Sequence, residues 1–173
     1  MKPSRHISLV GLSGTGKSSV APIVAERTGR EVADIDAMVE KTSGRTVQAI
    51  FSEDGEQRFR ELETAELRVA LGVRPTVIAT GGGIVTAAES ATLLGAQSTV
   101  VWLRADPSVL LDRLRNDAEP RPLLEGDPAS QLESMARRRY PAYESLADVV
   151  VDVDDLALAD VADRVAESVG VPS

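Results

Sequence analysis

Residues 11–18 read Gly-Leu-Ser-Gly-Thr-Gly-Lys-Ser, and this stretch decides the fold. It is a complete G-x-x-x-x-G-K-[ST] motif, with a short apolar segment at 7–10 before it and a segment of helical spacing at 19–27 after it. Strand, glycine loop and helix in this order hold nucleotide phosphates on backbone amides and on the helix N-terminus. In such loops Lys17 reaches the β- and γ-phosphates and the Ser18 hydroxyl ligates Mg²⁺. The motif therefore predicts a nucleoside-triphosphate site.

Length and composition narrow the class of protein. The chain has 173 residues, no cysteine and a net charge of -8. This length predicts a single domain, 1–173, and the lack of cysteine excludes disulfides and cysteine-based zinc sites. The acidic balance argues against nucleic acid as a partner, and no apolar run reaches the roughly 18 residues of a membrane span. We expect a cytoplasmic monomer that binds small molecules.

Short apolar segments alternate with helical patterns, which is typical of a parallel sheet wrapped by helices. The chain predicts a three-layer α/β fold, with five parallel strands near 5–10, 31–34, 76–79, 98–103 and 148–152. Helices are expected from the glycine loop to about 28, over 53–71, from an N-cap at Asp106 to about 116, through Arg137–Arg139 as far as Pro141, and after Asp155. The loop at about 117–129 contains three prolines and a glycine, and we expect it to act as a lid.

Two carboxylates follow the second expected strand. Asp34 and Asp36 flank Ile35, and residues two apart in an extended chain point to the same side. Ligands of open α/β sheets bind at the carboxyl ends of the strands. One carboxylate is therefore expected to face the metal and phosphates while the other reaches an acceptor hydroxyl. The alternative is a helix N-cap beside one solvated acid.

A triple glycine, Gly81–Gly83, follows the strand-like segment at 77–80. Three glycines expose bare backbone at the edge of the sheet, which suits a ligand resting against main-chain amides. An ordinary flexible connection from strand to helix is the alternative interpretation.

Several arginines are candidates for contact with anionic groups. Arg60 has Glu56 about one turn before it and Glu63 about one turn after it. It belongs either to a surface ion-pair ladder or to a substrate site, where its planar fork would grip a carboxylate and Glu63 would hold it in place. Arg121 lies in the expected lid, where it would neutralise charge on a transferred phosphoryl group. At most one or two of Arg137–Arg139 are expected to face inward.

Together these motifs resemble the shikimate kinases over nearly the whole chain. The likeness lies in residues 11–18, Asp34-Ile35-Asp36, Phe59-Arg60 with Glu61 and Glu63, Gly81–Gly83, Arg121-Pro122-Leu123-Leu124, and Arg139 four residues before Tyr143. The resemblance implies a P-loop kinase fold similar to the nucleoside monophosphate kinases. It also implies transfer of the γ-phosphoryl group of ATP, with Mg²⁺, to the 3-hydroxyl of shikimate, a step of aromatic amino acid biosynthesis through chorismate.

The resemblance also implies catalytic and metal-binding roles. Lys17 would bind the β- and γ-phosphates and stabilise the transition state. Asp36 would bind the acceptor hydroxyls as the candidate base, and Arg121 would close over the phosphates. Mg²⁺ would be held by Ser18 and, through water, by Asp34.

Binding roles follow from the same resemblance. Arg60 and Arg139 would clamp the shikimate carboxylate, and the backbone of Gly81–Gly83 would meet the ring. The acceptor-binding region would span about 34–62, and Arg113 would lie along the adenine. The implied ATP-binding set is Gly11, Gly14, Thr15, Gly16, Lys17, Ser18, Ser19, Arg113 and Arg121. Residues 152–156 contain no arginine, unlike some relatives, so no side-chain contact to adenine is predicted there.

Three rival functions share part of this pattern. A gluconate kinase has the same architecture and an acidic acceptor, so two arginines alone do not separate it. A nucleoside monophosphate kinase would need more arginines around a phosphate acceptor. A non-catalytic, ATP-dependent switch or binding module would leave the acceptor-side residues unexplained.

Overall fold

The computed structural model describes residues 5–116 and 126–171. Within them, five parallel strands form one sheet in the order β2-β3-β1-β4-β5. Their bounds are β1 His6–Val10, β2 Val32–Asp34, β3 Val77–Ala79, β4 Ser98–Arg104 and β5 Val149–Asp152. The predicted fold class is confirmed, and each strand lies within a residue or two of its expected position.

The central strand β1 sets the register of the sheet. Ser8 lies opposite Ile78 of β3 and Val100 of β4, and every residue of β1 is buried. Because all five strands are parallel, their carboxyl ends lie at one edge, and the loops that follow them meet there. The glycine loop follows β1, Asp34 ends β2, and Gly81–Gly83 follow β3.

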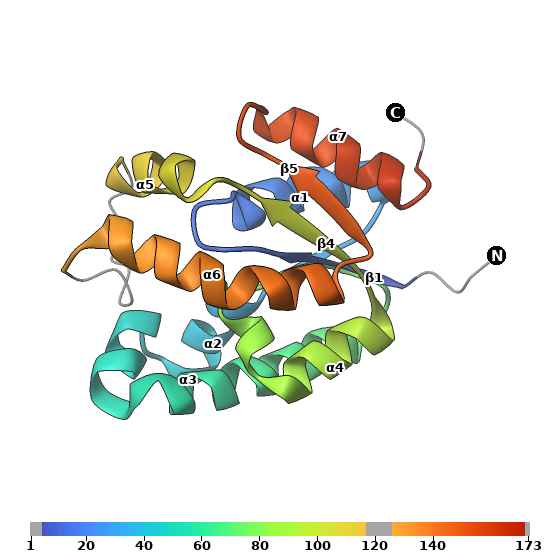
Figure 1. The fold of residues 1–173 in the computed structure, drawn as a ribbon. Coiled ribbons are helices and arrows are strands. Elements are labelled where there is room, and N and C mark those ends of the chain that lie inside the picture. Colours follow the sequence, from blue (N-terminus) through green and yellow to red (C-terminus); the bar gives the residue numbers. More distant parts are fainter. Residues whose placement is uncertain (1–4, 117–125, 172–173) are drawn as a thin grey trace.

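Helices cover both faces of the sheet (Figure 1). On one face, α1 (Lys17–Thr28) packs against α7 (Leu158–Ser168). On the other lie α4 (Ala88–Gln97) and α6 (Pro128–Leu146), which both contact β4. The connections include α5 (Pro107–Arg115), which packs on α6, and a short 3-10 helix at Ile84–Thr86. This is the three-layer arrangement that alternating strands and helices predict.

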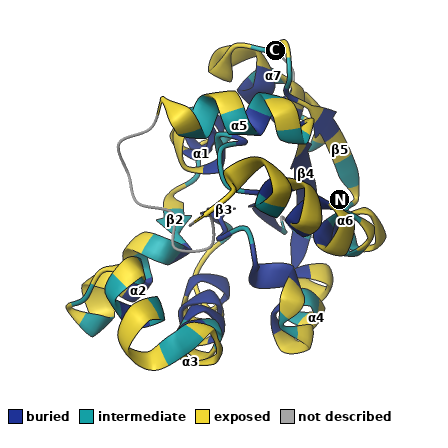
Figure 2. Cartoon of the chain, turned by 60° about the vertical axis from the view of Figure 1, so that its left-hand side comes forward, coloured by how far each residue is buried: buried dark blue, intermediate teal, exposed yellow. Residues whose placement is uncertain are grey.

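The helices α2 (Ile35–Ser43) and α3 (Val47–Leu71) pack against each other beside the sheet (Figure 2). They share a small apolar cluster of their own, formed by Val39, Ile50 and Phe59. α3 is interrupted at Gly55, whose φ of 85° and ψ of 171° are not helical. A left-handed φ costs glycine little, so the chain turns there without strain.

The expected helix boundaries need three corrections. The long helix begins at Val47 rather than 53, and α6 continues to Leu146 with Pro141 inside it. Pro141 is exposed, so the backbone carbonyl that it leaves without a helical partner can be hydrated. α7 is preceded by Ala157 and not capped by Asp155, whereas the cap at Asp106 is confirmed because its carboxylate accepts from Ser108 N–H.

No helix in the described part of the chain is long and apolar enough to cross a membrane.

Candidate functional site

A cavity of about 930 Å³ opens at the carboxyl edge of the sheet. It brings together stretches that are far apart in the chain, and three of them follow β1, β2 and β3 as predicted. Among the residues predicted for the site, the cavity is lined by Gly14, Gly16, Lys17, Ser18, Ser19, Asp34, Asp36, Arg60, Gly81, Gly82, Gly83, Arg113 and Arg139. Gly11 and Thr15 belong to the same loop but lie beneath its surface, and the Thr15 hydroxyl donates to Leu12 O at 3.0 Å.

The glycine loop has the backbone that a phosphate cradle needs. Gly11, Gly14 and Gly16 have φ values of 146°, 91° and 93°, which side-chain-bearing residues rarely adopt. At Gly11 a Cβ would also meet Leu103 O at 2.5 Å. Lys17 is buried, and its Nζ donates to Gly11 O at 2.6 Å and to Leu12 O at 2.9 Å. The ammonium group is therefore held inside the loop at the start of α1.

Asp34 caps a helix and also contacts the glycine loop. Its Oδ1 accepts from Ala37 N–H at 3.1 Å and caps α2, while its Oδ2 accepts from Ser18 Oγ at 2.6 Å. No cluster of three or more acidic or histidine side chains that could hold a metal occurs in residues 5–116 and 126–171. One carboxylate and one hydroxyl fit Mg²⁺, which typically takes few protein ligands and completes its shell with waters and phosphates.

Two carboxylates lie beside Gly81, the half-buried Asp36 and the fully buried Glu63. Asp36 Oδ1 and Glu63 Oε1 are buried with no hydrogen-bond partner among the described residues. Both border the point that a Cβ of Gly81 would occupy, Asp36 Oδ1 at 2.9 Å and Glu63 Oε1 closer still. Burial is the main cause that raises the pKa of both groups, that of Glu63 to about 7. The alternative of a helix cap beside a solvated acid therefore holds for the cap at Asp34 but not for Asp36, whose Oδ1 is buried.

Arg60 forms both of the ion pairs that the sequence suggests, and it also lines the cavity. Its Nη1 donates to Glu63 Oε2 at 2.9 Å and its Nη2 donates to Glu56 Oε1 at 3.0 Å. Its side chain is only 12% exposed, and the guanidinium carbon lies 5.2 Å from the centroid of the Phe59 ring. The fully buried Glu63 fixes the orientation of the arginine. A second aromatic ring, Phe51, also lines the cavity.

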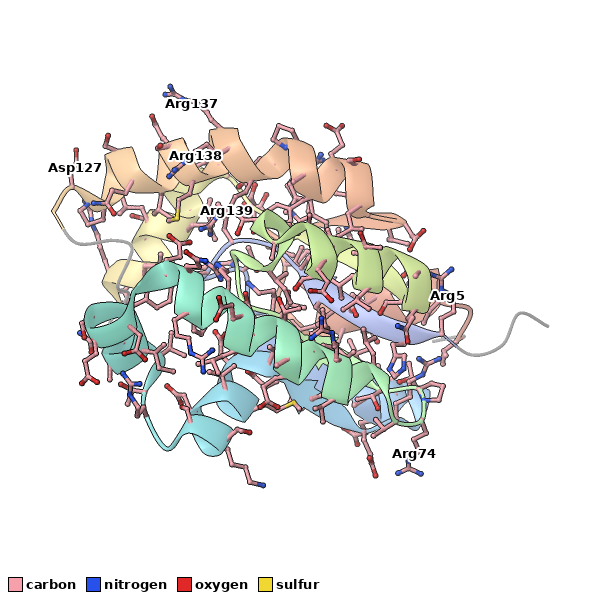
Figure 3. All side chains as sticks on the ribbon, turned by 90° about the horizontal axis from the view of Figure 1, so that it is seen from below. Arg5, Arg74, Asp127, Arg137, Arg138 and Arg139 are labelled. Atoms are coloured by element: carbon pink, nitrogen blue, oxygen red, sulfur yellow. The ribbon has the colours of Figure 1, made fainter. Side chains whose placement is uncertain are left out.

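Of the three consecutive arginines on α6, one faces inward. Arg139 is buried, whereas Arg137 and Arg138 are exposed, and Figure 3 shows Arg137 pointing away from the molecule. Arg139 Nη1 lies 3.5 Å from the position of a Cβ on Gly82. Burial lowers the pKa of Arg139, and the nearby positive charge of Arg60 lowers it further. Two guanidinium groups thus converge on the triple glycine, where an anionic ligand would relieve their repulsion.

Arg113 connects the glycine loop with the chain after β5. Its Nη1 donates to Gly14 O at 3.2 Å and its Nη2 donates to Val153 O at 3.0 Å. The guanidinium therefore lies between the glycine loop and the residue after β5, and its contact with adenine stays a prediction. Arg121 and most of the expected lid, about 117–129, lie outside the described residues.

Sequence reasoning gave no role to one residue of this region, Tyr143 of α6. It is fully buried, and its hydroxyl donates to Gly82 O. The only available signal was its place one helical turn after Arg139, which puts the two side chains on the same face of the helix.

Comparison with known proteins places the chain among shikimate kinases. The family model described as shikimate kinase matches residues 13–170. A shikimate kinase of Symbiobacterium thermophilum is 42% identical over 164 residues, 94% of either chain. One of Halorhodospira halophila is 42% identical over 173 residues, 99% of this chain and 97% of the relative. The solved shikimate kinase from Acinetobacter baumannii in complex with shikimate superposes with a TM-score of 0.90 at 34% identity, over 94% of this chain and 91% of that one.

Proposed function

The chain belongs to the shikimate kinase family of ATP-dependent phosphotransferases, and on that premise we propose that it transfers the γ-phosphoryl group of ATP to the 3-hydroxyl of shikimate. The products are shikimate 3-phosphate and ADP. The observation that carries the proposal is the convergence of Arg60 and Arg139 on the triple glycine, next to two carboxylates with unpartnered oxygens. An acceptor that combines a carboxylate with hydroxyl groups matches both halves of this arrangement.

The position of Gly82 supports the proposal, because this residue lies next to both the glycine loop and Arg139. The position of its Cβ would lie 3.3 Å from Ser13 N in the glycine loop and 3.5 Å from Arg139 Nη1. An acceptor seated on the triple glycine is therefore next to a nucleotide held by the loop. Phosphoryl transfer needs positioning and charge neutralisation more than covalent help, so this proximity is the main requirement.

On the nucleotide side we assign charge neutralisation to Lys17 and Mg²⁺ binding to Ser18 and Asp34. The metal ion, when bound, would neutralise charge on the phosphate oxygens. Lys17 supplies a buried ammonium at the N-terminus of α1, where the helix dipole adds to its attraction for phosphates. Arg121 of the lid is assigned to the transferred phosphoryl group and Arg113 to the adenine side.

On the acceptor side we assign Arg60 and Arg139 to the carboxylate and Asp36 to the reacting hydroxyl. In a loose transition state the hydroxyl keeps its proton until late, so Asp36 orients it first and takes the proton afterwards. Residues 34–62 form the acceptor-binding region of a single domain, 1–173. We further propose that the enzyme is a monomer that meets both small-molecule substrates in the cytoplasm.

The test is release of ADP from ATP and Mg²⁺, measured by a coupled assay with and without shikimate. Turnover that requires shikimate, with phosphorus NMR assigning the new phosphate to the 3-oxygen, is the expected result. The same assay with gluconate examines the rival acid acceptor. ATP hydrolysis that ignores every acid would instead indicate a nucleotide-dependent switch.

A further inference from the structure

Tyr143 lies where α6 meets the acceptor side of the cavity. Its side chain is fully buried, and its hydroxyl donates to the carbonyl oxygen of Gly82. Arg139 lies one turn before Tyr143 on the same helix, and its Nη1 lies 3.5 Å from the position of a Cβ on Gly82. The Tyr143 hydroxyl therefore ties α6, the helix that carries Arg139, to the triple glycine after β3.

The tyrosine is the donor of this hydrogen bond. A carbonyl oxygen can only accept, so the Tyr143 hydroxyl directs its proton at Gly82 O. Burial raises the pKa of Tyr143 far above its usual range, so the hydroxyl keeps the proton that it donates.

Aromatic neighbours fix the tyrosine ring. Its centroid lies 5.6 Å from that of Trp102 and 6.3 Å from that of Tyr140. These three rings pack where α6 covers β4, and Trp102 is 3% exposed. A ring held on two sides cannot swing away, so its hydroxyl is a fixed point in the site.

The hydrogen bond from Tyr143 to Gly82 also determines how the triple glycine faces the cavity. A peptide unit is planar and trans, so the carbonyl of Gly82 and the N–H of Gly83 point in opposite directions. Holding Gly82 O towards α6 therefore turns Gly83 N–H away from α6. Both glycines line the cavity, and neither has a side chain that would fix the peptide by itself.

We propose that Tyr143 is a positioning residue for the acceptor, which holds the Gly82–Gly83 peptide beside the Arg139 guanidinium in the geometry that receives the carboxylate and ring of shikimate. The proposal rests on the proposed function. It differs from a general packing role because it predicts an effect on one substrate only.

The test compares Tyr143→Phe with Tyr140→Phe. Both variants remove one hydroxyl from the same aromatic group, and both hydroxyls donate to a backbone carbonyl, since Tyr140 donates to Ala105 O. Ala105 follows β4 and is not among the residues that line the cavity. We expect Tyr143→Phe to raise the KM for shikimate about five- to tenfold, the usual range for a lost hydrogen bond, with the KM for ATP unchanged and kcat changed less than about threefold. Tyr140→Phe should leave the KM for shikimate unchanged.

A double variant shows whether Tyr143 acts through Arg139. In an Arg139→Lys background the guanidinium fork is already gone, so adding Tyr143→Phe should raise the KM for shikimate by less than it does in the wild type. The two changes should multiply fully if they act independently, and full multiplication would contradict the coupling.

The single tryptophan of the chain gives a readout that does not depend on a variant folding. Because Trp102 packs on Tyr143, shikimate bound at Gly82 and Arg139 should change the Trp102 emission of the wild-type enzyme. The proposal is overturned by an unchanged emission at saturating shikimate, by an unchanged KM in Tyr143→Phe, or by equal rises in the KM values for ATP and shikimate. A wild-type enzyme that ignores shikimate would instead overturn the proposed function.

Discussion

Replacement of Gly83 by alanine should damage the acceptor site without straining the backbone. Gly83 has a φ of -94° and a ψ of 6°, which alanine adopts readily, so the effect of the new methyl group is steric. Its Cβ would lie 2.7 Å from Arg60 Nη1 and closer still to Nη2. Ordinary contact needs about 3.5 Å, and Nη2 is the nearest atom, so the guanidinium must move by about 1.5 Å.

That displacement sets the size of the expected effect. A shift of about 1 Å in a positioning group can cost on the order of a hundredfold in rate. Losing one charge-assisted hydrogen bond costs about 1.5–3 kcal/mol, which corresponds to roughly 10- to 150-fold in affinity. We therefore expect the KM for shikimate to rise about 10- to 100-fold in Gly83→Ala, with the KM for ATP unchanged.

Steady-state kinetics with each substrate varied in turn measure this effect. Gly95→Ala is the matched control, because Gly95 lies in α4 and its Cβ would meet only the flexible end of Leu146 at 3.3 Å. In an Arg60→Ala background, Gly83→Ala should add little. The reasoning is refuted if the KM for ATP rises as much as that for shikimate. The triple glycine would then have moved against Ser13 while Arg60 stayed in place.

Three further predictions concern the charged groups of the cavity. Lys17→Ala should lower kcat by at least about a hundredfold, because no other described lysine lines the cavity. A smaller loss in the coupled assay would contradict a role for Lys17 in stabilising the transition state. Asp34→Asn should raise the Mg²⁺ concentration for half-maximal turnover several-fold. The melting temperature should stay nearly unchanged, since asparagine is an equally good N-cap. An unchanged Mg²⁺ requirement would contradict the assignment of Asp34 to the metal ion. Burial raises the pKa of Glu63 from 4.5 to about 7. Between these values the folded protein holds a proton on Glu63 that the unfolded chain releases. The free energy of unfolding therefore decreases as pH rises from about 4.5 to 7. Without ligands, the melting temperature of wild type relative to Glu63→Gln should fall over that range, and a constant difference would argue against the raised pKa.

The sequence predicts those parts of the fold that depend on local pattern. All five strands are found near their expected positions, because each is an apolar segment bounded by polar residues or glycine. α2 was not predicted, since it begins at the residue after β2 and no loop separates the two. α6 continues past Pro141 because the exposed side of a helix tolerates a proline that a sequence pattern treats as a stop.

The predicted site residues come together for a related reason. Motifs that follow parallel strands necessarily meet at one edge of the sheet, so Lys17, Asp36 and Gly82 could be grouped without coordinates. The order of the strands and the contacts across the cavity could not be obtained in this way. Tyr143 and Gly82 are 61 positions apart in the chain, and nothing local to either residue indicates that one bonds to the other.

The acceptor side of the cavity also has an energetic cost that suits its role. Burial opposes the charged form of Asp36, Glu63 and Arg139, since it raises the pKa of the two acids and lowers that of the arginine. Hydrophobic side chains at these positions would stabilise the empty protein more, because buried charges are expensive even when paired. These charged groups lie where a ligand with a carboxylate and hydroxyl groups would supply the interaction partners that they lack. Binding of that ligand therefore recovers stability that the free fold lacks, and an acceptor without a carboxylate would recover less of it.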